Sequence, residues 1–136
     1  MGRRSSEETS MVTKGLREIL MEADAATETI GALEALELLE QEGVIFVDVR
    51  ESHERARGFI PGSIHAPRGF LEFIAHPEGP MHNPAFTSGK RLILYCGSGT
   101  RSALAGKTLH DMGLSNLVNL AGGIQSWVQA GGDLES

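Results

Sequence analysis

Two continuous apolar runs of strand length, residues 44–47 and 92–95, constrain the fold of this chain more than any other feature. The first run is closed by Asp48 and the second by Cys96. Runs that are apolar on both faces are typical of parallel strands buried between layers of helices. The sequence therefore predicts an α/β fold built on a mainly parallel sheet.

The remaining segments supply the other strands and the covering helices. Further strands are expected at residues 117–120 and, as short pieces, around Ile30 and Ile64. Helices are expected at residues 32–40, with Gly31 at the N-cap and Gly43 as the stop, and at residues 103–112. Residues 67–90 contain four prolines, so we expect a long connection with one short helix inside it.

The N-terminal part of the chain adds a helix outside this pattern. Apolar residues fall on one helical stripe at Leu16, Ile19, Leu20 and Ala23. We therefore divide the chain into residues 1–26, a flexible N-terminus with an extra helix, and residues 27–136, a single domain. The sequence leaves open whether this stripe packs on its own domain, on a second copy or on another protein.

Composition narrows the classes of function. The chain has 12 Lys and Arg against 18 Asp and Glu, so it lacks the basic surface of a general nucleic-acid binder. One cysteine excludes an internal disulfide, and the Cys and His spacing gives no zinc pattern, so we expect no metal and no cofactor. No apolar run reaches the roughly 18 residues of a membrane span, and no signal sequence is evident at the N-terminus. We expect a cytoplasmic protein without a membrane partner.

The segment that follows the second apolar run carries the chemistry. It reads Cys96, Gly97, Ser98, Gly99, Thr100, Arg101 and Ser102 and leads into an alanine-rich helix. The start of a helix presents unpaired N–H groups and a partial positive charge, which stabilise a thiolate. A lone cysteine after an apolar strand is often an inert core residue. The glycine-rich polar loop favours the other interpretation, in which Cys96 is a nucleophile.

Several separated motifs resemble those of single-domain rhodaneses, the thiosulfate sulfurtransferase family. Residues 46–51 resemble the family's strand ending in Asp-Val-Arg, and residues 58–67 resemble its Gly-His-Ile-Pro-Gly-Ala segment, with Phe59 in place of the usual His. Residues 95–102 resemble the active-site loop, and Gly122-Gly123-Ile124 with Trp127 resembles the C-terminal element. The resemblance covers about residues 27–132. It implies a five-stranded, mainly parallel sheet flanked by helices on both faces.

The resemblance also implies a reaction and a set of site residues. Cys96 would take the outer sulfur of thiosulfate or a similar donor as a persulfide, and a thiol or cyanide would then accept it. The expected substrate-binding residues are Gly97, Ser98, Gly99, Thr100 and Arg101. From the residues themselves, Asp48 could accept hydrogen bonds from the loop or have a purely structural role in the turn after its strand. Arg68 could add a second cation near the mouth of the loop or be a solvated surface arginine, and Arg50 is expected to pair with Glu54. The loop has no Lys or Arg before Arg101, where some thiosulfate-specific members carry one.

Two other functions remain open at this stage. Four residues separate Cys96 from Arg101, whereas cysteine phosphatases and the related arsenate reductases have five. The shorter loop makes a smaller bowl, which suits one sulfur atom better than a phosphate group. The second alternative is a non-catalytic sulfur carrier or a protein-binding module of the same fold. The oligomeric state and the physiological donor and acceptor are not defined by the sequence.

Overall fold

A computed structural model of the chain describes residues 11–136. Residues 1–10, which make up most of the N-terminal segment expected to be flexible, lie outside the described residues. One five-stranded sheet organises the rest, in the order β1-β5-β4-β2-β3, and every pair of neighbouring strands is parallel. The strands are β1 (Glu28–Ile30), β2 (Val44–Asp48), β3 (Ile64–His65), β4 (Arg91–Tyr95) and β5 (Leu117–Leu120). The predicted α/β class and all five predicted strands are confirmed.

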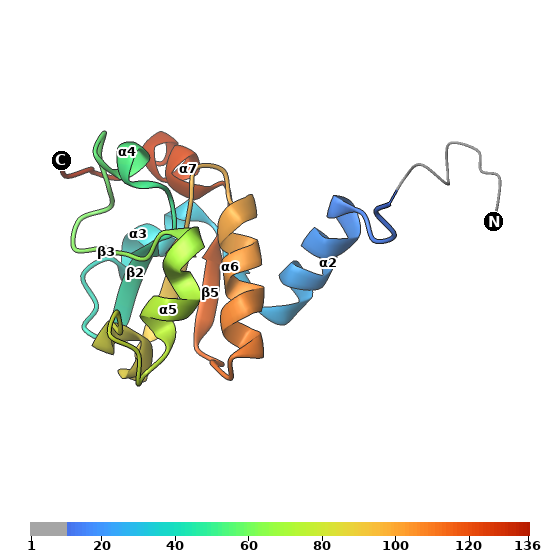
Figure 1. Ribbon diagram of the computed structural model, residues 1–136. Helices are drawn as coiled ribbons and strands as arrows, with labels where there is room; N and C mark the ends of the chain where they lie inside the picture. Colours follow the sequence, from blue (N-terminus) through green and yellow to red (C-terminus); the bar gives the residue numbers. More distant parts are fainter. Residues whose placement is uncertain (1–10) are drawn as a thin grey trace, which may run out of the picture.

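Helices cover both faces of the sheet (Figure 1). One apolar layer joins β2, β4 and β5 to α5 (Leu71–Ala75), α6 (Thr100–Asp111) and the 3₁₀ turn η2 (Pro84–Thr87). The other joins the opposite face to α3 (Ala32–Leu38) and α7 (Gly123–Gln129). Two further short elements lie between β2 and α5. The helix α4 (Ser52–Arg55) precedes β3, and the 3₁₀ turn η1 (Arg68–Phe70) directly precedes α5. Because β2 and β4 lie between the two apolar layers, residues 44–47 and 92–95 are apolar without alternation, as the sequence predicts.

Two helix boundaries differ from those predicted. The helix expected to run to residue 40 and stop at Gly43 ends at Leu38. There the Leu39 N–H donates to the Leu36 carbonyl and the Gln41 N–H to the Leu38 carbonyl, so the chain tightens into turns. The helix after the cysteine loop begins at Thr100, three residues earlier than residue 103, because Gly99 already serves as its N-cap.

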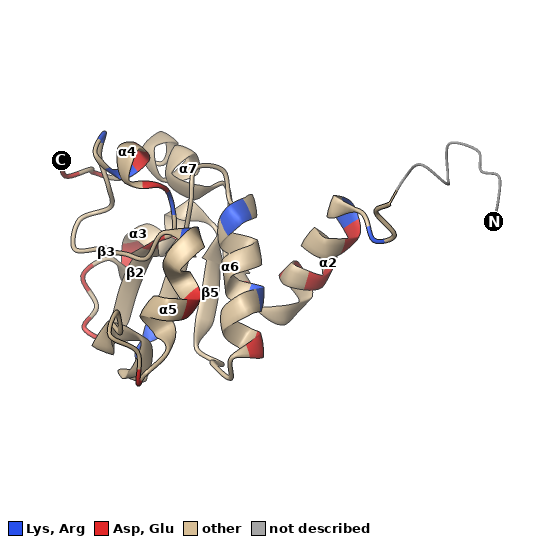
Figure 2. Ribbon diagram, viewed as in Figure 1, with Lys and Arg blue, Asp and Glu red and all other residues tan. Residues whose placement is uncertain are grey.

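The extra N-terminal helix is confirmed as α2 (Leu16–Ala26), and it packs against α6 (Figure 1). Its predicted stripe contacts the domain only in part. Ala23 is fully buried and Leu20 is half-buried, whereas the Leu16 side chain remains 64% exposed. Charged residues of both signs also lie along α2 (Figure 2). The C-terminal half of the helix is therefore its attachment to the domain.

Candidate active site

The parallel sheet places the ends of β2 and β4 side by side. Asp48 lies opposite Tyr95 in the strand register, and the Val49 N–H donates to the Tyr95 carbonyl. Cys96 directly follows Tyr95, so the thiol lies at the carboxyl-terminal edge of the sheet, where α/β proteins place their sites. The two polar residues that close the apolar runs are thus brought to one edge, as the sequence predicts.

The loop after Cys96 turns sharply into α6, and glycine permits that turn. Gly99, the N-cap of α6, has a φ of 104°, a value in the left-handed region. A Cβ atom at Gly99 would lie 3.1 Å from the Gly122 nitrogen, so the next loop also leaves no room for a side chain. The backbone from Cys96 to Thr100 therefore folds back over the sulfur.

The Cys96 sulfur is buried and surrounded by donors. The Gly99 N–H donates to Sγ at 3.1 Å, and both the N–H and the hydroxyl of Ser102 lie at 3.4 Å from it. Burial by itself raises the pKa of the Cys96 thiol, but these hydrogen bonds, with one from the Ser98 N–H, outweigh burial and lower the pKa below its ordinary value. The site therefore favours a thiolate.

Ser102 and Asn119 belong to this site, although no motif or spacing in the sequence distinguishes them. The Ser102 hydroxyl lies 2.6 Å from Asn119 Oδ1, and Asn119 Nδ2 donates to the Gly99 carbonyl at 3.1 Å. Asn119 is on β5, so it ties the neighbouring strand both to the loop and to the hydroxyl beside the sulfur. Only the strand order, which places β5 next to β4, shows that these residues meet.

Arg101 does not point freely into the bowl. Its guanidinium forms a two-pronged ion pair with the Glu54 carboxylate, at 2.7 and 2.9 Å. The hydrogen bonds from Arg101 lower the pKa of Glu54 to about 2, and the same pair raises the pKa of Arg101. The expected ion pair between Arg50 and Glu54 is wrong. The Glu54 carboxylate pairs with Arg101, and the contact of Arg50 with Glu54 is a hydrogen bond to the backbone carbonyl.

Asp48 is the centre of a buried polar network. It accepts hydrogen bonds from the Arg50 side chain at 2.8 and 2.9 Å, from Arg55 at 3.2 Å and from the Tyr95 hydroxyl at 3.2 Å. Burial raises the pKa of Asp48, but the two arginines outweigh burial and lower it. No hydrogen bond joins Asp48 to an N–H of the 97–101 loop among the described contacts. Asp48 therefore fixes the segment after β2, the structural alternative that the sequence left open, and the expected contact with the loop is not formed.

Arg68 is held away from the cysteine loop. Its guanidinium donates to the Thr108 hydroxyl at 2.9 Å and pairs with Glu72 at 3.2 Å. Thr108 lies two turns along α6 from Thr100, so the cation is bound at mid-helix and does not supply the second charge expected near the mouth.

The five predicted substrate-binding residues have different surroundings. Gly99 directs its N–H at the sulfur, and the Ser98 backbone contributes to the lowered pKa of Cys96. The Gly97 carbonyl accepts a hydrogen bond from the Gln125 N–H at 3.2 Å, at the start of α7. Thr100 is the first residue of α6, and Arg101 pairs with Glu54 as described above.

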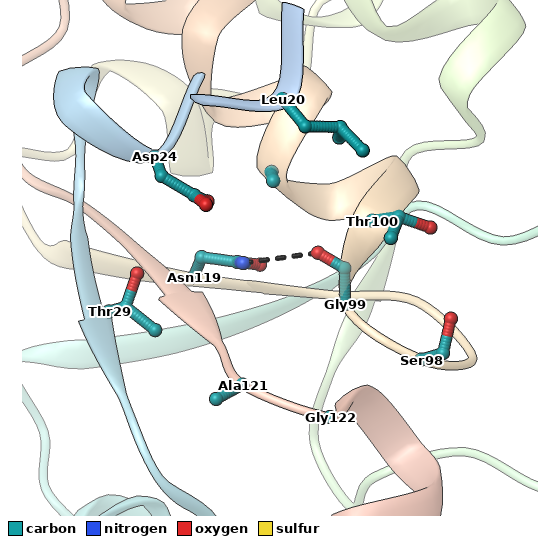
Figure 3. Close-up of a pocket in the computed structure, with 10 residues that line it drawn as sticks. Leu20, Asp24, Thr29, Ser98, Gly99, Thr100, Asn119, Ala121 and Gly122 are labelled. Carbon is teal, nitrogen blue, oxygen red and sulfur yellow. Dashed lines mark hydrogen bonds between the residues drawn. The ribbon is translucent and has the colours of Figure 1, made fainter. Parts of the chain in front are cut away.

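A cavity of about 400 Å³ lies on the other side of the loop, between it and α2 (Figure 3). Asp24 of α2 and Thr29 of β1 point into this cavity, and the Gly99 carbonyl and the Asn119 amide, hydrogen-bonded to each other at 3.1 Å, form part of its wall. Within residues 11–136, no three His, Cys, Asp or Glu side chains group closely enough to hold a metal ion. None of the helices in this range is long and apolar enough to cross a membrane.

Comparison with known proteins assigns the family. Residues 32–130 match the rhodanese-like domain. The chain belongs to the rhodanese family. The match starts at α3, so α2 and β1 of this rhodanese-family protein precede the matched region.

Curated relatives of this rhodanese-family protein carry sulfurtransferase names. A thiosulfate:glutathione sulfurtransferase of Saccharomyces cerevisiae is 36% identical over 100 residues, which cover 66% of this chain and 68% of the relative. A sulfurtransferase of Allochromatium vinosum is 31% identical over 94 residues, 69% of this chain and 80% of the relative.

Solved structures agree with the fold. A Rhodopseudomonas palustris protein of unknown function, described as a possible tyrosine phosphatase, is 40% identical, has a TM-score of 0.87, and is matched over 93% of this chain and 98% of its own. A thiosulfate sulfurtransferase from Pseudomonas aeruginosa is 26% identical with a TM-score of 0.70, over 88% of this chain and 22% of its own. The predicted rhodanese-like fold is confirmed.

Proposed function

We propose that this protein is a sulfurtransferase that moves a sulfane sulfur from thiosulfate or a similar donor to a thiophilic acceptor through a persulfide on Cys96. The observation that carries the proposal is the set of donors around one buried sulfur: the N–H groups of Gly99 and Ser102 and the Ser102 hydroxyl lie 3.1, 3.4 and 3.4 Å from Sγ. Family membership and the sulfurtransferase names of the relatives support sulfur transfer in general.

The reaction divides into two displacements at sulfur. The Cys96 thiolate attacks the outer sulfur of the donor, the donor's S–S bond breaks, and the remainder of the donor leaves with the electron pair. The loop N–H groups then stabilise the negative charge of the bound persulfide, as preorganised donors do in other covalent mechanisms. An acceptor thiolate or cyanide attacks the outer sulfur and releases Cys96 as a thiolate again.

A cysteine phosphatase or arsenate reductase activity is the rival proposal, and the description of the Rhodopseudomonas palustris structure raises it. Two features disfavour it. Only four residues separate Cys96 from Arg101. The Arg101 guanidinium, which would have to bind a phosphate, is already bound by Glu54.

The test combines intact-protein mass spectrometry with turnover. After incubation with a sulfane-sulfur donor, the wild type should gain the mass of one sulfur atom, and Cys96→Ser should gain none. Cys96→Ser should also abolish transfer to cyanide. A wild type that gains sulfur but passes it to no acceptor is a sulfur carrier, and one that gains none yet hydrolyses an aryl phosphate is a phosphatase. Either result contradicts the proposed enzyme.

A further inference from the structure

The Ser102 hydroxyl beside the sulfur has one proton and two acceptors within reach. Its oxygen lies 2.6 Å from Asn119 Oδ1 and 3.4 Å from Cys96 Sγ. An amide oxygen only accepts hydrogen bonds, so the contact with Asn119 is favourable only when the hydroxyl proton points at Oδ1. Ser102 is fully buried, and its proton is therefore directed either at this oxygen or at the sulfur.

The fold fixes which end of the Asn119 amide faces Ser102. Asn119 Nδ2 donates to the Gly99 carbonyl at 3.1 Å, as the dashed line in Figure 3 shows, and a carbonyl can bind only this end of the amide. Oδ1 is left to face the hydroxyl. Asn119 is 5% exposed, and β5 holds it between β1 and β4, opposite Thr29 and Leu94. The acceptor that competes with the sulfur is therefore held in a fixed place.

The stronger of the two acceptors changes as the charge on the sulfur changes. A thiol sulfur is a weak acceptor, whereas a hydrogen bond to a charged group is roughly twice as strong as one between neutral groups. While Cys96 is a thiol, the hydroxyl proton is therefore directed at Asn119 Oδ1, at the shorter distance. When Cys96 is a thiolate, the charge on Sγ attracts the proton away from the amide. Once Cys96 carries a second sulfur, the negative charge lies on the outer atom, and the proton returns to Asn119.

We propose that Asn119 is a positioning residue for sulfur transfer at Cys96: it holds the Ser102 hydroxyl proton while Sγ is uncharged and releases it to Sγ when the sulfur is a thiolate. The inference rests on the proposed function, in which the thiolate is the attacking group. Among the contacts of residues 11–136, Asn119 forms no hydrogen bond with Sγ, so it acts through Ser102. Asn119 thereby limits how far the hydroxyl stabilises the thiolate.

A double-mutant cycle on the full-length protein measures this competition. The pH midpoint of Cys96 alkylation is compared with and without Ser102→Ala, first in the wild type and then in Asn119→Leu. Leucine is close to asparagine in size but cannot accept the proton, and the Gly99 carbonyl still accepts the Ala103 N–H at 3.3 Å. Ser102→Ala should raise the midpoint in both backgrounds. The rise should be larger in Asn119→Leu, because there the hydroxyl proton is directed only at Sγ.

The matched control is Asn116→Leu, in the segment before β5. The Asn116 side-chain amide also donates to a backbone carbonyl, that of Lys90, but at the opposite end of the strands from the cysteine loop. Ser102→Ala should raise the midpoint by the same amount in Asn116→Leu as in the wild type. Asn119→Ala also removes the competing oxygen, and it gives the same test should the leucine variant not fold.

The size of the rise separates the possible roles of Asn119. A merely structural role would move the midpoint of Asn119→Leu itself and leave the rise caused by Ser102→Ala unchanged, and that result would overturn the proposal. So would a smaller rise, which would mean that Asn119 directs the hydroxyl toward the sulfur. Alkylation needs no sulfur donor, so either result leaves the proposed sulfur transfer standing. Absence of a sulfur adduct on the wild type would instead overturn the proposed function and leave the measured competition for the proton unaffected.

Discussion

At the scale of single residues, the chemistry depends on how Cys96 is solvated. A buried thiol normally resists ionisation, and here the protein replaces water with directed N–H and O–H groups. Ser102 contributes its N–H and its hydroxyl, whose single proton is shared between Sγ at 3.4 Å and Asn119 Oδ1 at 2.6 Å. The acidity of the thiol is therefore a property of a few named contacts that can be removed one at a time.

Ser102→Ala should raise the pKa of Cys96, because it removes the hydroxyl that lies 3.4 Å from Sγ and leaves the Ser102 N–H in place. Alkylation of the only cysteine at neutral pH should slow accordingly. Ser98→Ala is the control, since only the backbone of Ser98 contacts the sulfur. Equal alkylation rates for Ser102→Ala and the wild type would contradict this role of the hydroxyl.

At the scale of elements, two neighbours hold the loop in place. The start of α7 lies against it, where the Ile124 N–H donates to the Cys96 carbonyl at 2.9 Å. The ion pair between Glu54 and Arg101 joins α4 to α6 on another side. Each contact gives a prediction.

Gly123→Ala should displace the loop, because a Cβ at Gly123 would lie 2.5 Å from the Cys96 carbonyl oxygen. We expect loss of sulfur addition at Cys96 and a lower free energy of unfolding. Gly131→Ala is the matched control: Gly131 also has a positive φ, of 96°, but a Cβ added there would meet no heavy atom within 4 Å. It should cost about 1–2 kcal/mol in stability and keep sulfur addition. Equal loss of sulfur addition in both variants would refute the contact as the cause.

The ion pair predicts a pH dependence of stability. The folded-state pKa of Glu54 is lowered to about 2, below that of an unfolded glutamate, so the pair's contribution is complete above about pH 4.5 and is lost as pH falls toward 2. Glu54→Gln should lower the free energy of unfolding at pH 7 by on the order of 1 kcal/mol, since Arg101 is 40% exposed and water screens the pair. Urea unfolding across this pH range should show the difference vanish at the acidic end. A difference that is constant with pH would exclude the pair as its source.

How much could be predicted from the sequence depends on the range of each interaction. The strands and the cysteine loop follow from local patterns: residues 44–47 and 92–95 are apolar without alternation, and glycines follow Cys96. The partner of Arg101 does not, because Arg101 meets Glu54, 47 positions away in the sequence, only after the fold brings the two residues together. For the same reason, the sequence does not identify Asn119 as a residue of the site. Its position on β5 matters only once β5 lies next to β4.

At the scale of the whole molecule, α2 is an addition that precedes the matched rhodanese-like region. We propose that residues 27–136 form the domain and that α2 is an attachment held by its C-terminal half. Ala23 is fully buried where α2 packs on the domain, whereas Ala25 on the same helix is exposed.

Ala23→Asp should detach α2, because a carboxylate at a fully buried position without a partner is strongly unfavourable. Limited proteolysis should then cut within residues 16–26 faster than in the wild type, while Cys96 still accepts sulfur from thiosulfate. Ala25→Asp makes the same chemical change at the exposed position and should leave the cleavage rate unaltered. Indistinguishable digestion of the two variants would show that Ala23 does not anchor the helix.

The central claim is that backbone and hydroxyl donors make the single thiol of this protein acidic enough to react as a thiolate. The pH dependence of the alkylation rate of wild-type Cys96 tests it most directly, because no other cysteine contributes to the signal. The predicted profile has its midpoint below the value of about 8.5 for a free cysteine. A midpoint at or above that value would contradict the claim and the sulfur-transfer chemistry built on it.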